Sequence, residues 1–87
     1  MRTTIENTEV TLHYSFERMG RGHYKVICEA GYLNHNVQYT AVTTDSEFID
    51  ELSECDSFEE KQKMLAKRFD FSEKIGEDIY FFNFKNK

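Results

Sequence analysis

The stretch "EVTLHYSFERMGRGHYKVICEA", residues 9–30, decides the fold because its apolar residues recur at every second position on both sides of a glycine-containing turn. Such alternation puts apolar side chains on one face of a β-strand and polar side chains on the other. The alternating runs are residues 9–17 and 23–30, and Gly20 and Gly22 between them tolerate the positive φ angles of a tight turn. This stretch predicts an antiparallel hairpin with one apolar face.

The alternation continues in "YLNHNVQYTAV", residues 32–42, after a turn expected around Gly31. This run puts Leu33, His35, Val37, Tyr39 and Ala41 on one face, so it predicts a third strand and completes an antiparallel meander.

The apolar period changes from 2 to 3.6 after the third strand. In "TTDSEFIDEL", residues 43–52, Thr44 stands three residues before Glu47, which is the spacing of a helix capping box. A second capping signal follows in "CDSFEE", residues 55–60. Two pairs fit this second signal: Ser57 with Glu60, or Asp56 with Glu59. We therefore expect one broken helix or two short helices across residues 44–70.

The C-terminal "EDIYFFNFK", residues 77–85, is apolar on both faces and rich in aromatic residues, which favours a strand. The expected order is β-β-β-α-α-β: a three-stranded meander, one or two helices and a C-terminal strand, in a two-layer α+β sandwich. A chain of 87 residues is expected to form a single domain, residues 1–87.

Composition restricts the functional classes. The formal charge of −5 disfavours a general nucleic-acid binder, because phosphate contacts require a surplus of Lys and Arg. No apolar run approaches the roughly 20 residues that cross a bilayer, and the N-terminus lacks the apolar segment of a secretory signal, so no membrane partner is expected. Two cysteines, Cys28 and Cys55, are too few for a disulfide framework and predict reduced thiols in the cytoplasm.

The most unusual segment is "EFIDELSECDSFEE", residues 47–60, with seven carboxylates and no Lys or Arg. Carboxylates in the first turn of a helix have a structural explanation in the helix dipole. That explanation covers Glu47 but leaves Asp50, Glu51 and Glu54. Glu47 with Glu51 and Asp50 with Glu54 form like-charge pairs one helical turn apart, which destabilise a helix. These candidate partner-binding residues are Glu47, Asp50, Glu51 and Glu54. They indicate a surface for a basic groove on another protein, as an inhibitor, an immunity protein or a mimic of nucleic-acid phosphates would present.

The interpretation of this segment that requires no partner is a solvated helix face. In that case the charge would be partly neutralised by the cations downstream, which are Lys61, Lys63, Lys67 and Arg68.

The alternative function is weak nucleic-acid binding by the basic first hairpin. Arg18, Arg21 and Lys25 lie on or beside the expected turn, and His13 and His23 are expected on the same outer face as Lys25. Three cations are too few for more than weak phosphate binding.

Catalysis and metal binding have no sequence support. The histidines and cysteines form no metal-binding clip, and "MGRG" lacks the Lys and the helix of a phosphate-binding loop. We expect His35 to be a partly buried histidine rather than a ligand. The acidic surroundings of Cys55 disfavour a reactive thiolate. We expect no catalytic residues, no metal and no cofactor.

These observations predict a small acidic, non-enzymatic protein that binds another macromolecule. Small size and acidity without a catalytic motif are typical of accessory proteins from mobile elements or phages. A homodimer is an alternative partner, if a second copy covers the outer side of the aromatic C-terminal segment.

Overall fold

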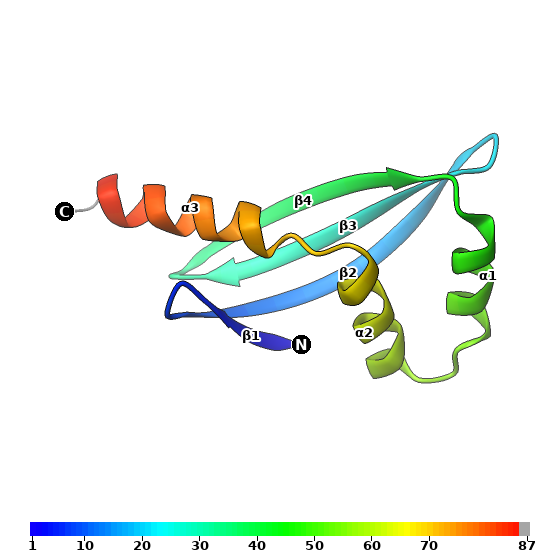
Figure 1. Ribbon diagram of the computed structural model, residues 1–87, viewed down its shortest axis with the longest axis horizontal. Coiled ribbons are helices and arrows are strands. Elements are labelled where there is room, and N and C mark those ends of the chain that lie inside the picture. Colours follow the sequence, from blue (N-terminus) through cyan, green and yellow to red (C-terminus); the bar gives the residue numbers. More distant parts are fainter. Residues whose placement is uncertain (86–87) are drawn as a thin grey trace.

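The computed structural model describes residues 1–85 and shows a four-stranded antiparallel sheet followed by three helices (Figure 1). The strands lie in the order β1-β2-β3-β4, so each strand pairs with its neighbour in sequence. The strands are β1 (Arg2–Ile5), β2 (Thr8–Gly20), β3 (His23–Tyr32) and β4 (His35–Thr43). The helices are α1 (Ser46–Glu54), α2 (Phe58–Arg68) and α3 (Ser72–Lys85).

The expected meander is present, but the expected order β-β-β-α-α-β is wrong at both ends of the chain. The C-terminal segment is the helix α3, in which Ile75 and Ile79, four residues apart, are buried. Aromatic residues favour strands only where their side chains fit a half-buried pleated surface, and here packing of the isoleucine stripe decides the conformation. The short strand β1 was not predicted, because "RTTI" contains a single apolar residue.

Each hairpin of the sheet turns through at least two residues with positive φ, which matches the right-handed twist of the strands. Gly22 has φ 74°, as its position in the glycine turn predicted. The turn expected around Gly31 is wrong: Gly31 lies inside β3, and the chain reverses at Leu33 and Asn34, with φ 48° and 64°. Leu33 therefore lies in the turn and not on the apolar face, and it is exposed.

The core lies between one face of the sheet and the three helices. Alternate residues of β2 and β3 form its floor, as the period of two predicted. The helices cover this floor with Leu52 from α1, Leu65 from α2 and Ile79 from α3, each at most 2% exposed. Within residues 1–85 no helix covers the opposite face of the sheet, and residues such as His13 and Glu29 there are exposed.

The interruption between α1 and α2 is confirmed, and each helix has a side-chain cap. The Glu60 N–H donates to Ser57 Oγ at 3.3 Å, which is one of the two expected caps of α2. The cap of α1 is Asp45 and not Thr44: Asp45 Oδ1 accepts from the Phe48 N–H at 3.1 Å. An ionised carboxylate at this position also interacts favourably with the helix dipole, which a threonine hydroxyl does not.

A buried glutamine attaches α2 to the edge of β2. Gln62 is 5% exposed, and its side-chain amide pairs with the backbone of Tyr14: Oε1 accepts from the Tyr14 N–H at 2.7 Å, and Nε2 donates to the Tyr14 carbonyl at 2.8 Å. The N-terminal end of β1 lies just before this point, since Met1 exchanges backbone hydrogen bonds with Leu12. The Gln62 amide therefore replaces the next residue of a strand and satisfies groups that burial would otherwise leave unpaired.

Candidate functional site

The four acidic residues singled out in the sequence lie together on one exposed face of α1. We call Glu47, Asp50, Glu51 and Glu54 the acidic face. With about 100° of rotation per residue, their positions fall within an arc of about 100°. The buried residues Ile49 and Leu52 lie on the opposite side of the helix. Burial of that apolar stripe fixes the rotation of α1 and directs every carboxylate of the acidic face to solvent.

Within residues 1–85, no cation lies within 4 Å of a carboxylate of the acidic face. Arg68, one of the cations expected to neutralise this segment, instead pairs with the helix cap Asp45 at 2.6 Å and lies over the Phe48 ring. Lys61 and Lys63 on α2 form no ion pair in this part of the chain. The two like-charge pairs of α1, Glu47 with Glu51 and Asp50 with Glu54, are therefore not offset by direct contacts.

The cations of the first hairpin do not share a face. Lys25 lies on the outer side of the sheet, opposite Glu17 in the register of β2 and β3. Arg18 is opposite Tyr24, and its guanidinium lies 5.9 Å from the centre of that ring on the helix side. Arg21 occupies the turn between the strands. His23 is the next residue to Lys25 on this side of β3. His13 is on the same side but lies opposite Glu29, four residues farther along, and stacks against Phe58 of α2.

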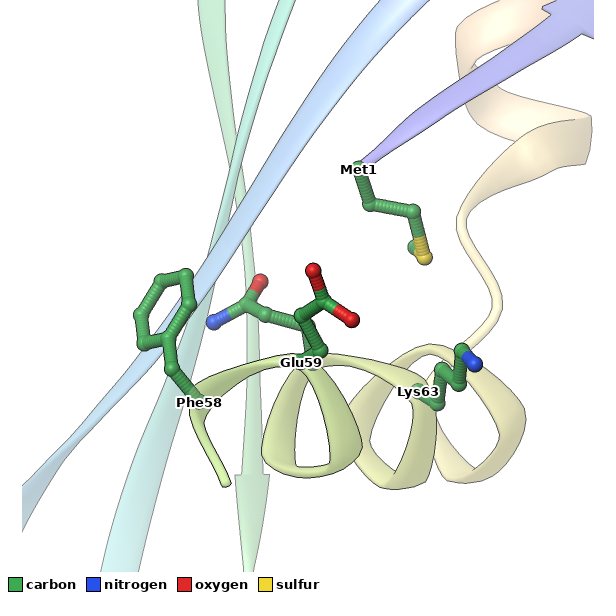
Figure 2. Close-up of a pocket in the computed structure, with 5 residues that line it drawn as sticks. Met1, Phe58, Glu59 and Lys63 are labelled. Carbon is green, nitrogen blue, oxygen red and sulfur yellow. The ribbon is translucent and has the colours of Figure 1, made fainter.

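Several hollows open on the described surface. Figure 2 shows one of about 290 Å³ between the start of β1 and α2, lined by Met1, Phe58, Glu59, Gln62 and Lys63. Its exposed lining is mostly apolar, and its two charged residues lie on one exposed face of α2. Among residues 1–85, no group of three or more His, Cys, Asp or Glu side chains is arranged to hold a metal ion.

The titratable groups with raised pKa values, Tyr14, Cys28 and Tyr39, lie in the core. Burial raises the pKa of the Tyr39 hydroxyl, and its hydrogen bond to Asp78 of α3 raises it further. Burial also raises the pKa of Cys28, which is a free thiol like Cys55. Both effects keep the groups neutral, the opposite of what an activated nucleophile requires. Tyr39 therefore acts as a neutral donor that ties β4 to α3.

His35 lies on the helix side of the sheet, as its place in the alternation predicted, but it is exposed. Its ring meets Phe82 of α3 edge to face, with 4.3 Å between ring centres.

One exposed surface was not predicted from the sequence. Tyr80, Phe81 and Phe84 of α3 are 66%, 58% and 67% exposed, because the C-terminal turns of this helix extend past the end of the sheet (Figure 1). The sequence contains the necessary signal: with a period of 3.6, the stripe of Ile75 and Ile79 turns these three side chains outward.

Comparison with known proteins adds no functional information: no family model, curated protein or solved structure matches the chain. In the described part of the chain, no helix is both long enough and apolar enough to cross a membrane.

Proposed function

We propose that this protein is a non-enzymatic binding protein that uses the acidic face of α1 to occupy a basic surface on another protein. One observation carries the proposal: four carboxylates share one exposed helix face and none has a cation partner in residues 1–85. Such an array costs stability within the helix, so a role outside the chain accounts for it better than folding does. The inhibitor, immunity-protein and phosphate-mimic classes expected from the sequence all fit this geometry.

The position of α1 suits contact with a partner. Figure 1 shows α1 at the end of the sheet where β4 finishes, far from the C-terminal end of α3. The chain is elongated, 45 Å in its longest dimension, so the acidic face lies near one end of the molecule. A concentrated negative patch at one end also steers a basic partner during diffusional encounter. The reduced thiols are compatible with a cytoplasmic partner, as expected from the sequence.

The basic hairpin supports nucleic-acid binding less well. Arg18 and Lys25 lie on opposite sides of the sheet, so one phosphate backbone cannot contact both in a single groove. Glu17 also lies directly opposite Lys25 and reduces the positive potential of the outer face.

The binding test compares two variants with the same change in net charge. The face variant carries Asp50→Asn, Glu51→Gln and Glu54→Gln. The control carries Glu9→Gln, Glu59→Gln and Glu73→Gln, three exposed carboxylates outside α1. Each protein is cross-linked to its partners in lysate of the source cell. A partner that the native protein captures should also be captured by the control and should not be captured by the face variant. The native complex should also weaken as salt rises. Equal capture of the partner by both variants would show that the acidic face is not the binding surface.

The face variant should also be more stable than the native protein. It removes both like-charge pairs of α1, each worth about 0.2–0.5 kcal/mol, so the free energy of unfolding in low salt should rise by about 0.4–1 kcal/mol. The control should be unchanged or slightly less stable, because Glu59 and Glu73 lie in the first turns of α2 and α3. Urea unfolding at low and high salt measures both. A face variant that is less stable than the native protein would contradict the finding that the carboxylates of the acidic face have no cation partner.

A further inference from the structure

The two edges of the sheet differ in how far they are protected from pairing with another strand. Along the β2 side, β1 covers the edge as far as Leu12, and the Gln62 amide covers Tyr14. Further along, the register shifts between Arg18 and Gly20, and an irregularity of this kind, with charged residues, discourages strand pairing. Short strands, bulges, charges and covering side chains are the usual devices by which proteins block an exposed edge.

The opposite edge, β4, has none of these devices. Its nine residues, "HNVQYTAVT", contain no Asp, Glu, Lys, Arg or Pro, and their register with β3 runs without a shift from Tyr32 opposite His35 to Tyr24 opposite Thr43. A neutral, regular strand of this length exposes a row of backbone donors and acceptors that can pair with another strand.

The hairpin geometry identifies which backbone groups of β4 are free. A two-residue turn makes the residues that flank it, Tyr32 and His35, a hydrogen-bonded pair. Pairing with β3 then recurs at every second residue, and the N–H and C=O groups of the intervening residues point outward. These residues are Asn36, Gln38, Thr40 and Val42. Within residues 1–85 no backbone hydrogen bond to these outward groups is formed.

We propose that the outer edge of β4 pairs with β4 of a second copy of this chain, antiparallel about a twofold axis at Tyr39. In this register Gln38 lies opposite Thr40 of the second copy, and Asn36 lies opposite Val42. All four outward residues are then used, whereas a shift by two residues in either direction leaves one unpaired in each chain. The product is a continuous eight-stranded sheet closed by symmetry.

The side chains of β4 suit this pairing with itself. No charge is brought against a like charge within the paired strands, because β4 contains no Asp, Glu, Lys or Arg. On the outer face the polar Gln38 meets the polar Thr40, and Val42, which is 56% exposed in the single chain, gains a neighbour. On the inner face Val37 lies opposite Ala41 of the second copy, so apolar residues meet apolar residues.

The blocked β2 edge restricts the assembly to two copies. Pairing of β4 with the β2 edge of another copy would repeat head to tail and grow a filament. That side offers only the outer edge of β1, which is four residues long and carries Arg2, and the segment of β2 beyond Tyr14, where the register shift and Arg18 interrupt it. Among residues 1–85, pairing of β4 with β4 leaves only the short outer edge of β1 and the irregular end of β2 free, so growth stops at the dimer.

The register can be tested with two double variants that share one substitution. Gln38→Lys with Thr40→Lys places two Lys–Lys pairs across the proposed interface. Gln38→Lys with Thr40→Glu places two Lys–Glu pairs there and leaves the same backbone. Both variants put the shared Lys beside Glu29, the neighbour of position 38 on β3. The dissociation constants of the two variants should differ on the order of tenfold or more, with the Lys–Glu dimer tighter.

Light scattering over a concentration series measures the mass, and circular dichroism verifies that each variant is folded. The native protein and the Lys–Glu variant should approach twice the chain mass of 10.4 kDa, and the Lys–Lys variant should remain at the single-chain mass. Thr40→Pro, which removes an outward N–H without breaking a bond to β3, should also be monomeric, whereas Thr40→Ala should dimerise. A native protein that stays monomeric up to about millimolar concentration overturns the proposal. Equal dissociation constants for the two double variants overturn the register.

Discussion

Replacing Gln62 by Met should lower the free energy of unfolding by about 2–4 kcal/mol, an unusually large effect for a polar residue on an amphipathic helix. Methionine has a similar length and volume, so packing is retained. It cannot replace either hydrogen bond to Tyr14, and one N–H and one C=O are left buried without partners. Each such group costs about 1–3 kcal/mol. Urea unfolding of the variant and the native protein gives the difference directly.

Two further variants isolate the cause. Lys63→Met, at the next and exposed position of α2, makes a similar change in side chain and should alter stability by no more than about 0.5 kcal/mol. Gln62→Glu keeps the acceptor for the Tyr14 N–H but places a carboxylate against the Tyr14 carbonyl. Protonation restores a donor, so this variant should recover stability relative to the native protein as pH falls. A loss below 1 kcal/mol for Gln62→Met would show that water satisfies the Tyr14 groups.

Ile79→Ala should lower the free energy of unfolding by about 2–5 kcal/mol, whereas Phe81→Ala should change it by no more than about 0.5 kcal/mol. Ile79 is 1% exposed and packs in the core, and its truncation leaves a cavity; Phe81 is 58% exposed. The comparison distinguishes a helix from a strand, because in a strand these two side chains would share a face and respond alike. Thermal or urea unfolding of both variants measures the contrast, and equal losses would contradict the assignment of α3.

The acidic face could be predicted from the sequence almost completely. The carboxylates can be read directly from the sequence, and their spacing at three and four residues places them on one side of any helix that forms there. The absence of ion pairs could not be predicted, because the partner of Arg68 depends on how α1 and α2 pack. In that packing Arg68 forms an ion pair with Asp45, 23 residues away, and the acidic face has no cation partner within residues 1–85.

The error at the C-terminus has a physical reason. "IYFFNF" is apolar at nearly every position, so its pattern fits both the period of 2 of a strand and the period of 3.6 of a helix. Local propensity then favours a strand, since aromatic residues are common in sheets. The helix forms because the sheet ends at β4 and its helix-side face still requires cover near Tyr39 and His35, which contact Asp78 and Phe82 of α3.

The sequence by itself determined the features that depend on neighbours along the chain. These are the alternating faces of β2 and β3, the glycine turn between them, the interruption between α1 and α2 and the grouping of the acidic face. The tertiary structure decided what depends on residues far apart: the conformation of α3, the Gln62 amide on Tyr14, the pairing of Arg68 with Asp45 and the bare edge of β4. Local preferences are worth fractions of a kcal/mol per residue, whereas burial of an isoleucine or of an unpaired amide is worth several, so long-range packing prevails wherever the two conflict.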